Sequence, residues 1–203
     1  IEDNILYFGD KKGNLYAVNA KTGQVKWKFK VASAIMYSTP AVTADTVVIG
    51  TVDGELYAVN KNNGEQEWMK EMDHPIVSSP VNDENIIYYV SYRQNEGLLT
   101  AVNGENGDKK WEMNFEGPSP YAIAYQDDTI FVGTLAGDLH AVDAKTQQEK
   151  WSFSTPGEII AAPITTKNVV YIGDSEGNLY GLNIDTGQEQ WSFKGQNTIV
   201  SAP

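Results

Sequence analysis

Short apolar segments, bounded by glycine, asparagine or aspartate, recur along the whole chain and are typical of β-strands. The first segment, residues 4–9, is followed after a tight turn by Leu15-Tyr16-Ala17-Val18-Asn19. A third segment ends near Trp27, and a fourth, residues 35–42, is rich in small side chains. The 3.6-residue periodicity of an amphipathic helix does not accompany them. The pattern therefore predicts an all-β fold built from units of four short strands.

This unit occurs five times, and each copy carries one tryptophan. The five are Trp27, Trp68, Trp111, Trp151 and Trp191, and successive ones are 41, 43, 40 and 40 residues apart. Four strands in a repeat of about 40 residues are typical of a β-propeller blade. We expect a single domain, residues 1–203, whose blades are residues 1–30 with 197–203, then 31–72, 73–115, 116–155 and 156–196.

The two ends of the sequence match different strands of one unit. The chain opens in the first apolar strand, and Pro203 matches Pro40 and Pro163 in the fourth. We expect residues 199–203 to pair with the three strands of residues 1–30, which would close a five-bladed ring of four-stranded antiparallel blades. The alternative is that the five units are part of a longer propeller.

A phrase of the form Ala-x-Asn/Asp-x-x-Thr/Asn-Gly-x-x-x-Trp ends at the tryptophan, as in residues 17–27, 58–68 and 101–111. It resembles the tryptophan-docking repeat of β-propellers of the pyrroloquinoline-quinone (PQQ) type, over the whole chain. That family includes quinoprotein alcohol dehydrogenases, the assembly lipoprotein BamB, and extracytoplasmic sensor and scaffold domains. The resemblance implies that each indole lies between the alanine of its own repeat and the glycine turn of the next. The docking residues so implied are the five tryptophans with Ala17, Ala58, Ala101, Ala141, Gly23, Gly64, Gly107 and Gly187.

Two repeats depart from this phrase. Gln147 replaces the turn glycine of the fourth repeat, and Gly181 replaces the alanine of the fifth. We expect looser docking at both positions, because the first lacks glycine's tolerance of a positive φ and the second lacks a methyl group.

Composition narrows the possible functions. The formal net charge of -12 disfavours nucleic acid and anionic lipid as partners. The absence of cysteine excludes disulfides and thiolate chemistry, and no apolar run approaches the ~18 residues of a membrane span. No export signal precedes Ile1 in this sequence. The family resemblance nevertheless favours an extracytoplasmic location, periplasmic or at the cell surface.

Sequence fragments that look catalytic fall in turns that repeat for structural reasons. Asp185-Thr186-Gly187 spells an aspartic-protease triplet and Lys21-Thr22-Gly23 a β-lactamase fragment, yet both occupy the turn before a tryptophan strand. Acidic loops such as Asp53-Gly54-Glu55 lack the ligand spacing of a calcium site. His74 and His140 lie in different strand contexts. We therefore expect no catalytic residue, no metal site and no cofactor, and we interpret the chain as a non-enzyme.

One irregularity points to a functional surface. Residues 91–96 form a connection three residues longer than its counterparts, and they contain the only arginine, Arg93. Loops on one side of a propeller share a face, and arginine and tyrosine are enriched at binding hot spots. The candidate interaction face comprises Tyr92, Arg93, His74, Tyr37, Tyr121 and Glu158. An ordinary solvated loop is the alternative interpretation.

These observations favour a non-catalytic scaffold or sensor that binds another protein. The alternative is a propeller that binds a small ligand, such as a sugar, a peptide or a quinone cofactor, on its axis or on this face. A fragment of a PQQ-dependent dehydrogenase is a more remote alternative. The resemblance argues against it, because those enzymes are much longer and carry adjacent cysteines that this chain lacks.

Overall fold

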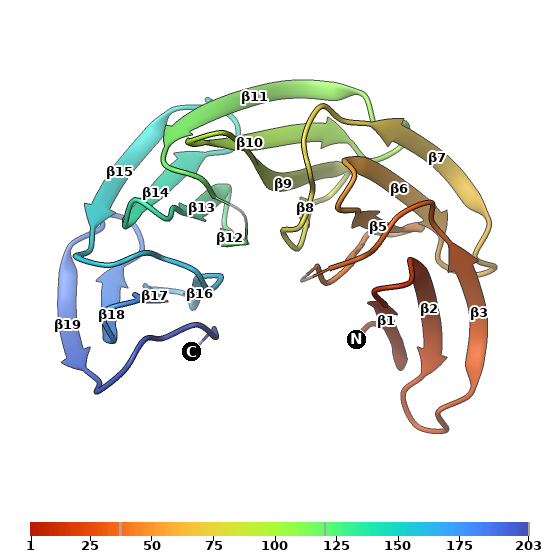
Figure 1. Cartoon of the computed structure of the whole chain (residues 1–203), viewed down its shortest axis with the longest axis horizontal. Coiled ribbons are helices and arrows are strands. Elements are labelled where there is room, and N and C mark those ends of the chain that lie inside the picture. Colours follow the sequence, from red (N-terminus) through yellow and green to blue (C-terminus); the bar gives the residue numbers. More distant parts are fainter. Residues whose placement is uncertain (37, 120, 203) are drawn as a thin grey trace. The chain divides into compact units, whose positions relative to one another are not determined.

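The computed structural model describes residues 1–36, 38–119 and 121–202, and it arranges them as 19 β-strands joined by turns (Figure 1). None of these residues is helical, so the all-β prediction is confirmed. Within the same ranges, no helix has the length and apolarity needed to cross a membrane. Tyr37 of the predicted interaction face and Pro203 of the predicted closing strand lie outside the described residues.

The strands form five sheets, in which strands that are consecutive in the chain are neighbours (Figure 1). The sheet orders are β1-β2-β3, β4-β5-β6-β7, β11-β10-β9-β8, β12-β13-β14-β15 and β16-β17-β18-β19. The bounds are β1 (Ile5–Gly9), β2 (Asn14–Asn19), β3 (Val25–Lys30), β4 (Ala41–Val42), β5 (Thr46–Gly50), β6 (Glu55–Asn60), β7 (Gln66–Glu71), β8 (Val81–Asp83), β9 (Ile86–Arg93), β10 (Glu96–Asn103), β11 (Lys109–Glu116), β12 (Ile123–Gln126), β13 (Thr129–Gly133), β14 (Asp138–Asp143), β15 (Glu149–Ser154), β16 (Ile164–Thr165), β17 (Val169–Gly173), β18 (Asn178–Asn183) and β19 (Glu189–Lys194). Pairing is antiparallel, for example between β1 and β2 and between β17 and β18, and the five sheets fit a propeller-like fold.

The chain divides into two compact units. The first comprises Ile1–Tyr89 with Thr100–Glu112, and it contains the sheets β1–β3 and β4–β7 together with β8. The second comprises Val90–Leu99 with Met113–Pro203, and it contains the sheets β12–β15 and β16–β19. The strands β9, β10 and β11 are divided between the two units.

The fourth strand of the repeat is shorter than its apolar segment suggests, and it begins later. Among the described residues of the segment predicted as a strand over 35–42, only those of β4, at its end, pair in a sheet. Pro40, Pro80 and Pro163 each stand immediately before the first residue of β4, β8 and β16. Proline has no N–H to donate to a ladder, so pairing starts after it. The predicted start of this strand was therefore wrong by several residues.

Closure of the ring remains a prediction. The sheet β1–β3 has three strands, and residues 199–202 are not in a strand.

The hydrophobic core lies between successive sheets. In the first unit the tryptophan strand of one sheet faces the middle strands of the next, with Trp27 packing among Val47, Ile49, Tyr57 and Val59. The second unit repeats this arrangement, with Trp151 packed against a cluster that contains Val170, Ile172 and Leu182. The sheet β4–β7 therefore contributes its two faces to two different core clusters, with Val47 and Ile49 in one and Val48 and Trp68 in the other.

Candidate interaction surfaces

Three tryptophans make the same hydrogen bond to the following repeat. The indole Nε1–H groups of Trp27, Trp68 and Trp151 donate to the backbone carbonyls of Lys61, Gly104 and Ile184, at 2.9, 2.9 and 3.0 Å. Each acceptor directly follows the asparagine that opens the turn of the next repeat. The bond fixes the indole relative to that turn, because a buried N–H needs a partner.

The turn glycine of the next repeat packs directly against each of these indoles. A methyl group placed on Gly64 would lie 2.8 Å from the ring of Trp27, and one on Gly107 would lie 2.7 Å from the ring of Trp68. Gly187 approaches Trp151 in the same way, at 2.5 Å. On the partner strand, Ala17, Ala58 and Ala141 stand opposite the three tryptophans. At these three positions, each indole therefore lies opposite an alanine of its own sheet and against a turn glycine of the following repeat. The ring of Trp111, from the third repeat, contacts Tyr88 with centroids 5.9 Å apart.

The two departures from the repeat behave differently. Gln147 keeps the left-handed backbone of the glycines, with φ of 60°, and its N–H still donates to Asp143 O at 2.8 Å. Beside Gly181, the Trp191 indole fills the space of the missing methyl, which would lie 2.5 Å from Cε2. Trp191 is 41% exposed, compared with 7% for Trp27.

The irregular segment 91–96 is a strand extension instead of the predicted loop. Strand β9 runs on to Arg93, β10 starts at Glu96, and Gln94-Asn95 form a two-residue turn. Gln94 has φ of 52°, the left-handed conformation that such tight turns require. The Arg93 Nη2 atom lies 2.9 Å from Glu96 Oε2 across the turn. The extra residues therefore lengthen a hairpin and place Tyr92 and Arg93 on it.

Backbone contacts tie the turn of this hairpin to Gly117, which follows the last residue of β11. The Gly117 N–H donates to Asn95 O at 3.0 Å, and Glu96 and Gly117 form a parallel bridge. The buried Ser119 hydroxyl donates to Gly133 O at 2.6 Å. Beside the hairpin is a hollow of about 350 Å³ lined by Asn95, Glu116, Gly117, Pro118, Leu135, Ala136 and Glu158.

The interaction face stays a prediction, and its described residues are divided between the two units. Arg93 and Tyr92 lie on the hairpin, and both its turn residue Asn95 and Glu158 line the adjoining hollow. Ser175 holds the backbone of Glu158, with its hydroxyl accepting from Glu158 N at 2.9 Å. Tyr121 belongs to the same unit and is half-buried, whereas His74 belongs to the first unit.

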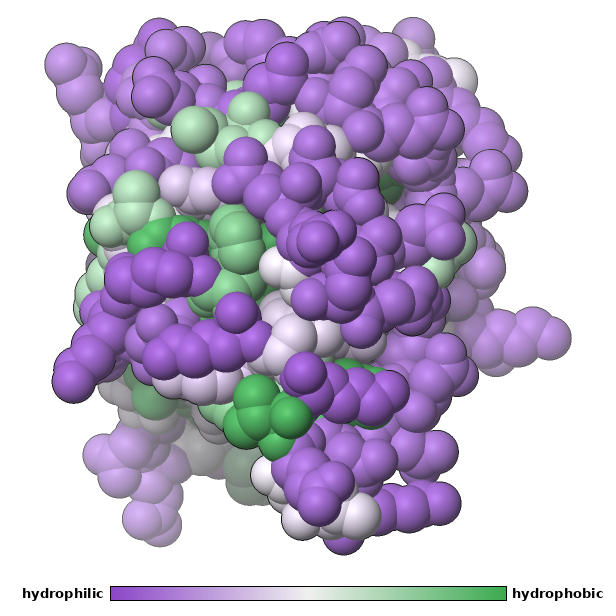
Figure 2. All heavy atoms as spheres, turned by 90° about the vertical axis from the view of Figure 1, so that its right-hand side faces the viewer, coloured by the Kyte–Doolittle hydropathy of each residue, from purple (hydrophilic) through white to green (hydrophobic). Residues whose placement is uncertain are grey.

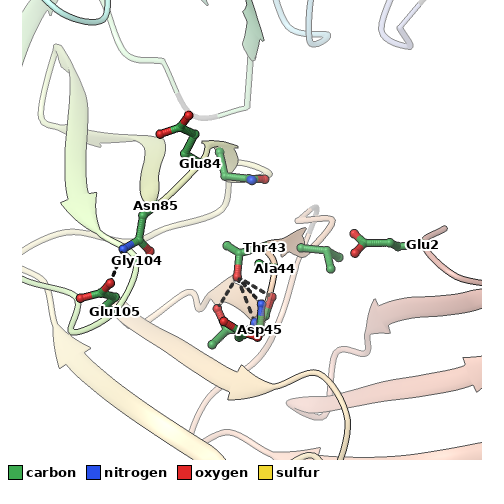
Figure 3. A pocket seen from close by; sticks show the side chains of 11 residues that line it. Glu2, Thr43, Ala44, Asp45, Glu84, Asn85, Gly104 and Glu105 are labelled. Carbon is green, nitrogen blue, oxygen red and sulfur yellow. Dashed lines mark hydrogen bonds between the residues drawn. The ribbon is translucent and has the colours of Figure 1, made fainter.

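A second hollow, of about 540 Å³, lies in the first unit (Figure 3). Glu84 and Asn85 stand on one side of it and Glu2 on the other, with Asp45 between them (Figure 3). The remaining lining residues include Glu105, so four carboxylates surround this space.

Hydrogen bonds hold the walls of this acidic hollow in place. Asn85 Nδ2 donates to Glu105 Oε1 at 2.7 Å, and Lys61 Nζ lies 3.1 Å from Glu2 Oε1. The bond to Glu2 is the main reason that the pKa of Lys61 lies above its ordinary value. Sequence analysis did not select these residues. Each lies in an ordinary turn, and only the fold brings the turns together.

The wider surface is strongly polar. The face in Figure 2 is largely hydrophilic, and apolar side chains show through in only a few places. Among the described residues, no three carboxylate or imidazole side chains converge as ligands for a metal ion.

The chain is similar in fold to several solved structures, although its sequence identity to them is low. BamB from Moraxella catarrhalis superposes with a TM-score of 0.76 at 18% identity, over 97% of this chain and 63% of its own. Quinohemoprotein alcohol dehydrogenase from Comamonas testosteroni superposes with a TM-score of 0.82 at 15% identity, over 96% of this chain and 42% of its own. The computationally designed Ika8 protein gives 0.69 at 18% identity, over 100% and 75% of the two chains. These likenesses show the fold, and the chain spans less than two thirds of the first two proteins.

Comparison at the level of sequence points to one family. A search of curated protein sequences found no match. The profile of the family described as "Outer membrane protein assembly factor BamB" matches residues 11–123 and again residues 95–202. Together the two matches cover nearly the whole chain, and the predicted PQQ-type repeat is confirmed. The chain therefore belongs to this BamB-like family of PQQ-type β-propeller repeats.

Proposed function

We propose that this chain is a non-catalytic scaffold that binds another protein through the extended β9–β10 hairpin. The observation that carries the proposal is the position of Arg93 and Tyr92, which lie at the end of the lengthened strand β9, next to the turn Gln94-Asn95. Arginine and tyrosine are the residue types that contribute most often to binding hot spots.

The geometry of the hairpin suits such a role. Its turn residue Asn95 is bonded to Gly117, so little backbone freedom is lost when a partner binds. The Arg93 and Glu96 side chains are about half exposed, 53% and 49%. An exposed ion pair of this kind contributes little to stability. A carboxylate of the partner can therefore replace Glu96 as the ion-pair partner of Arg93 at a small cost in free energy. The hollow lined by Glu158 can then receive a neighbouring side chain of the partner.

The family description supports the class of function and the location. It names an assembly factor of the outer membrane, and we accordingly place this chain outside the cytoplasm. Since the chain spans 63% of the length of the Moraxella BamB, the partners of the whole protein are part of the proposal.

A second function, small-ligand binding, is favoured by the acidic hollow of the first unit. Its volume of about 540 Å³ lies in the range of small-molecule sites. Carboxylates and the Asn85 amide would select a ligand rich in hydroxyl or amine donors, such as a sugar or a peptide. The similarity to an alcohol dehydrogenase, at 15% identity, adds the fold alone.

A charge-reversal experiment tests the hairpin. Wild type, Arg93→Glu and Lys109→Glu are immobilised at equal density, and proteins captured from an extract of the source cells are quantified. Lys109 is the matched control because it has the same exposure, 53%, and its salt bridge to Glu112 also spans three residues. We expect a partner that wild type and Lys109→Glu capture equally and that Arg93→Glu captures at least tenfold less. Equal capture by all three proteins would refute the hairpin as the binding surface.

A further inference from the structure

Asparagine stands directly before glycine at three positions of the chain, Asn63-Gly64, Asn103-Gly104 and Asn106-Gly107. We propose that two of them, Asn63 and Asn106, are sites of spontaneous deamidation in the folded protein. The two residues lie in the turns that connect β6 to β7 and β10 to β11. Neither turn belongs to the hairpin that carries Arg93, so the modification is independent of the proposed binding function.

The reaction needs no enzyme. The backbone nitrogen of the glycine attacks the carboxamide carbon of the asparagine, the carboxamide C–N bond breaks, and ammonia leaves with the proton of the glycine N–H. Water then opens the resulting succinimide ring at one of its two carbonyls, which gives isoaspartate or aspartate. Glycine favours the attack because it has no side chain to obstruct the approach of its nitrogen.

All three asparagines have their carboxamide oxygen bonded in the way that this attack requires. Asn63 Oδ1 accepts from Glu65 N at 3.0 Å, and Asn106 Oδ1 accepts from Asp108 N at 3.0 Å. Asn103 Oδ1 accepts from the N–H of the residue two positions on at 2.7 Å. Negative charge develops on this oxygen during the attack, and a backbone N–H bonded to it stabilises that charge. The difference between the sites therefore lies in the glycine nitrogen.

The nitrogen of Gly104 is held by another part of the fold. It donates to Asn85 O, in the turn between β8 and β9, at 2.7 Å. The Gly104 carbonyl accepts from the Trp68 indole at 2.9 Å, and Gly104 is buried. To release this nitrogen, the turn after Asn103 has to separate from the β8–β9 turn. We therefore expect the fold to protect Asn103.

The nitrogens of Gly64 and Gly107 are held only within their own turns, as far as the described residues show. Gly64 N donates to Asn60 O at 2.9 Å, and Gly107 N donates to Asn103 O at 2.7 Å. Both Asn63 and Asn106 are exposed. Opening of a single exposed turn frees each nitrogen, and such local opening costs much less than global unfolding.

The product weakens the contact between repeats. Isoaspartate adds one carbon to the backbone directly before Gly64, where a methyl group would already lie 2.8 Å from the ring of Trp27. A close-packed contact of this kind does not absorb a displaced backbone without loss. In addition, Asn63 Nδ2 donates to Glu65 Oε2 at 2.8 Å. A carboxylate at position 63 would replace this donor and repel Glu65.

Other repeats of the chain supply a control that cannot react. Thr22 and Thr186 occupy the corresponding position, and threonine has no carboxamide group. Their hydroxyls accept from the N–H two residues on, at 3.3 and 3.4 Å, as Asn63 Oδ1 does. The variant Asn63→Thr/Asn106→Thr therefore keeps the hydrogen bond of the turn and removes the reacting group.

Peptide mass spectrometry tests the proposal on the full chain, incubated in mildly alkaline buffer below its melting temperature. We expect Asn63 and Asn106 to be converted at least tenfold faster than Asn103, mostly to isoaspartate, which fragmentation distinguishes from aspartate. In urea, where no fold protects Asn103, the three rates should become similar. Equal rates at the three sites in the folded protein would overturn the proposal. Protection of Asn63 and Asn106 in the folded protein, while the unfolded chain reacts, would also overturn it.

Urea unfolding of aged samples tests the structural consequence. The unfolding midpoint of aged wild type should fall relative to fresh protein, whereas Asn63→Thr/Asn106→Thr should keep its midpoint through the same incubation. An unchanged midpoint in wild type converted at both sites would refute the effect on tryptophan packing. An equal fall in the threonine variant would assign the loss to another reaction.

Discussion

At the scale of single residues, a turn glycine can serve two purposes, to allow a positive φ and to pack against an indole. Comparing Gly23 with Gly64 distinguishes the two purposes. Gly23 and Gly64 have nearly the same backbone, with φ of 73° and 77°. Only Gly64 lies against an indole, that of Trp27. Backbone conformation therefore favours glycine at both positions, and packing against the tryptophan adds a second reason for it at Gly64 alone.

This difference predicts that a glycine-to-alanine substitution lowers the free energy of unfolding more at position 64 than at position 23. Gly64→Ala and Gly23→Ala both introduce a left-handed alanine, which costs about 1–2 kcal/mol. Gly64→Ala adds a clash with Trp27 at 2.8 Å, and overpacking typically costs about 1–3 kcal/mol more. Denaturant unfolding at low protein concentration measures both free energies. Equal losses would show that the indole does not dock on the glycine.

The docking residues could be predicted from the sequence because one spacing repeats five times. The contacts of Trp27, Trp68 and Trp151 follow from that spacing together with the family resemblance. The altered repeats could not be resolved in this way. A sequence does not show that Gln147 would adopt the glycine conformation, or that Trp191 would fill the space beside Gly181.

At the scale of secondary-structure elements, the third repeat departs most from the others. Strands β9 and β10 are eight residues long, whereas the corresponding strands β13 and β14 have five and six. The extra length in residues 91–96 was recognised from the sequence but interpreted as a loop. Whether added residues continue a ladder depends on the pairing of two strands, which their composition alone does not determine.

Strand β9 also carries a buried tyrosine, Tyr89, whose raised pKa makes the stability of the protein depend on pH. Tyr89 on β9 is 2% exposed, and burial raises its pKa from 10.0 to about 12, while a hydrogen bond with Thr100 opposes the shift. Because the folded pKa is the higher one, Tyr89 contributes stability fully below pH 10, and this contribution, on the order of 2 kcal/mol, is lost as the pH rises towards 12.

Tyr89→Phe should therefore flatten the loss of stability between pH 10 and pH 12. The control is Tyr92→Phe, which removes the hydroxyl of an exposed tyrosine and should leave the slope unchanged. Urea unfolding at several pH values supplies the comparison. A slope in Tyr89→Phe that equals that of wild type would refute the assignment.

At the scale of the whole molecule, one kind of interface between neighbouring repeats is used repeatedly. Each covered tryptophan gives its indole N–H and its ring to the following repeat. Neither hollow was predicted as such, since each is formed by turns that are distant in the sequence.

The central claim, that the tryptophans are docking residues between repeats, is tested most directly by the free energy of unfolding of Trp68→Ala and Trp191→Ala at low protein concentration. Trp68 is 8% exposed and bonded to Gly104, whereas Trp191 is 41% exposed and has no following repeat over it in the described structure. We predict a loss of about 3–5 kcal/mol for Trp68→Ala, as for other buried aromatic residues, and less than half of that loss for Trp191→Ala. Equal losses at the two positions would contradict the claim.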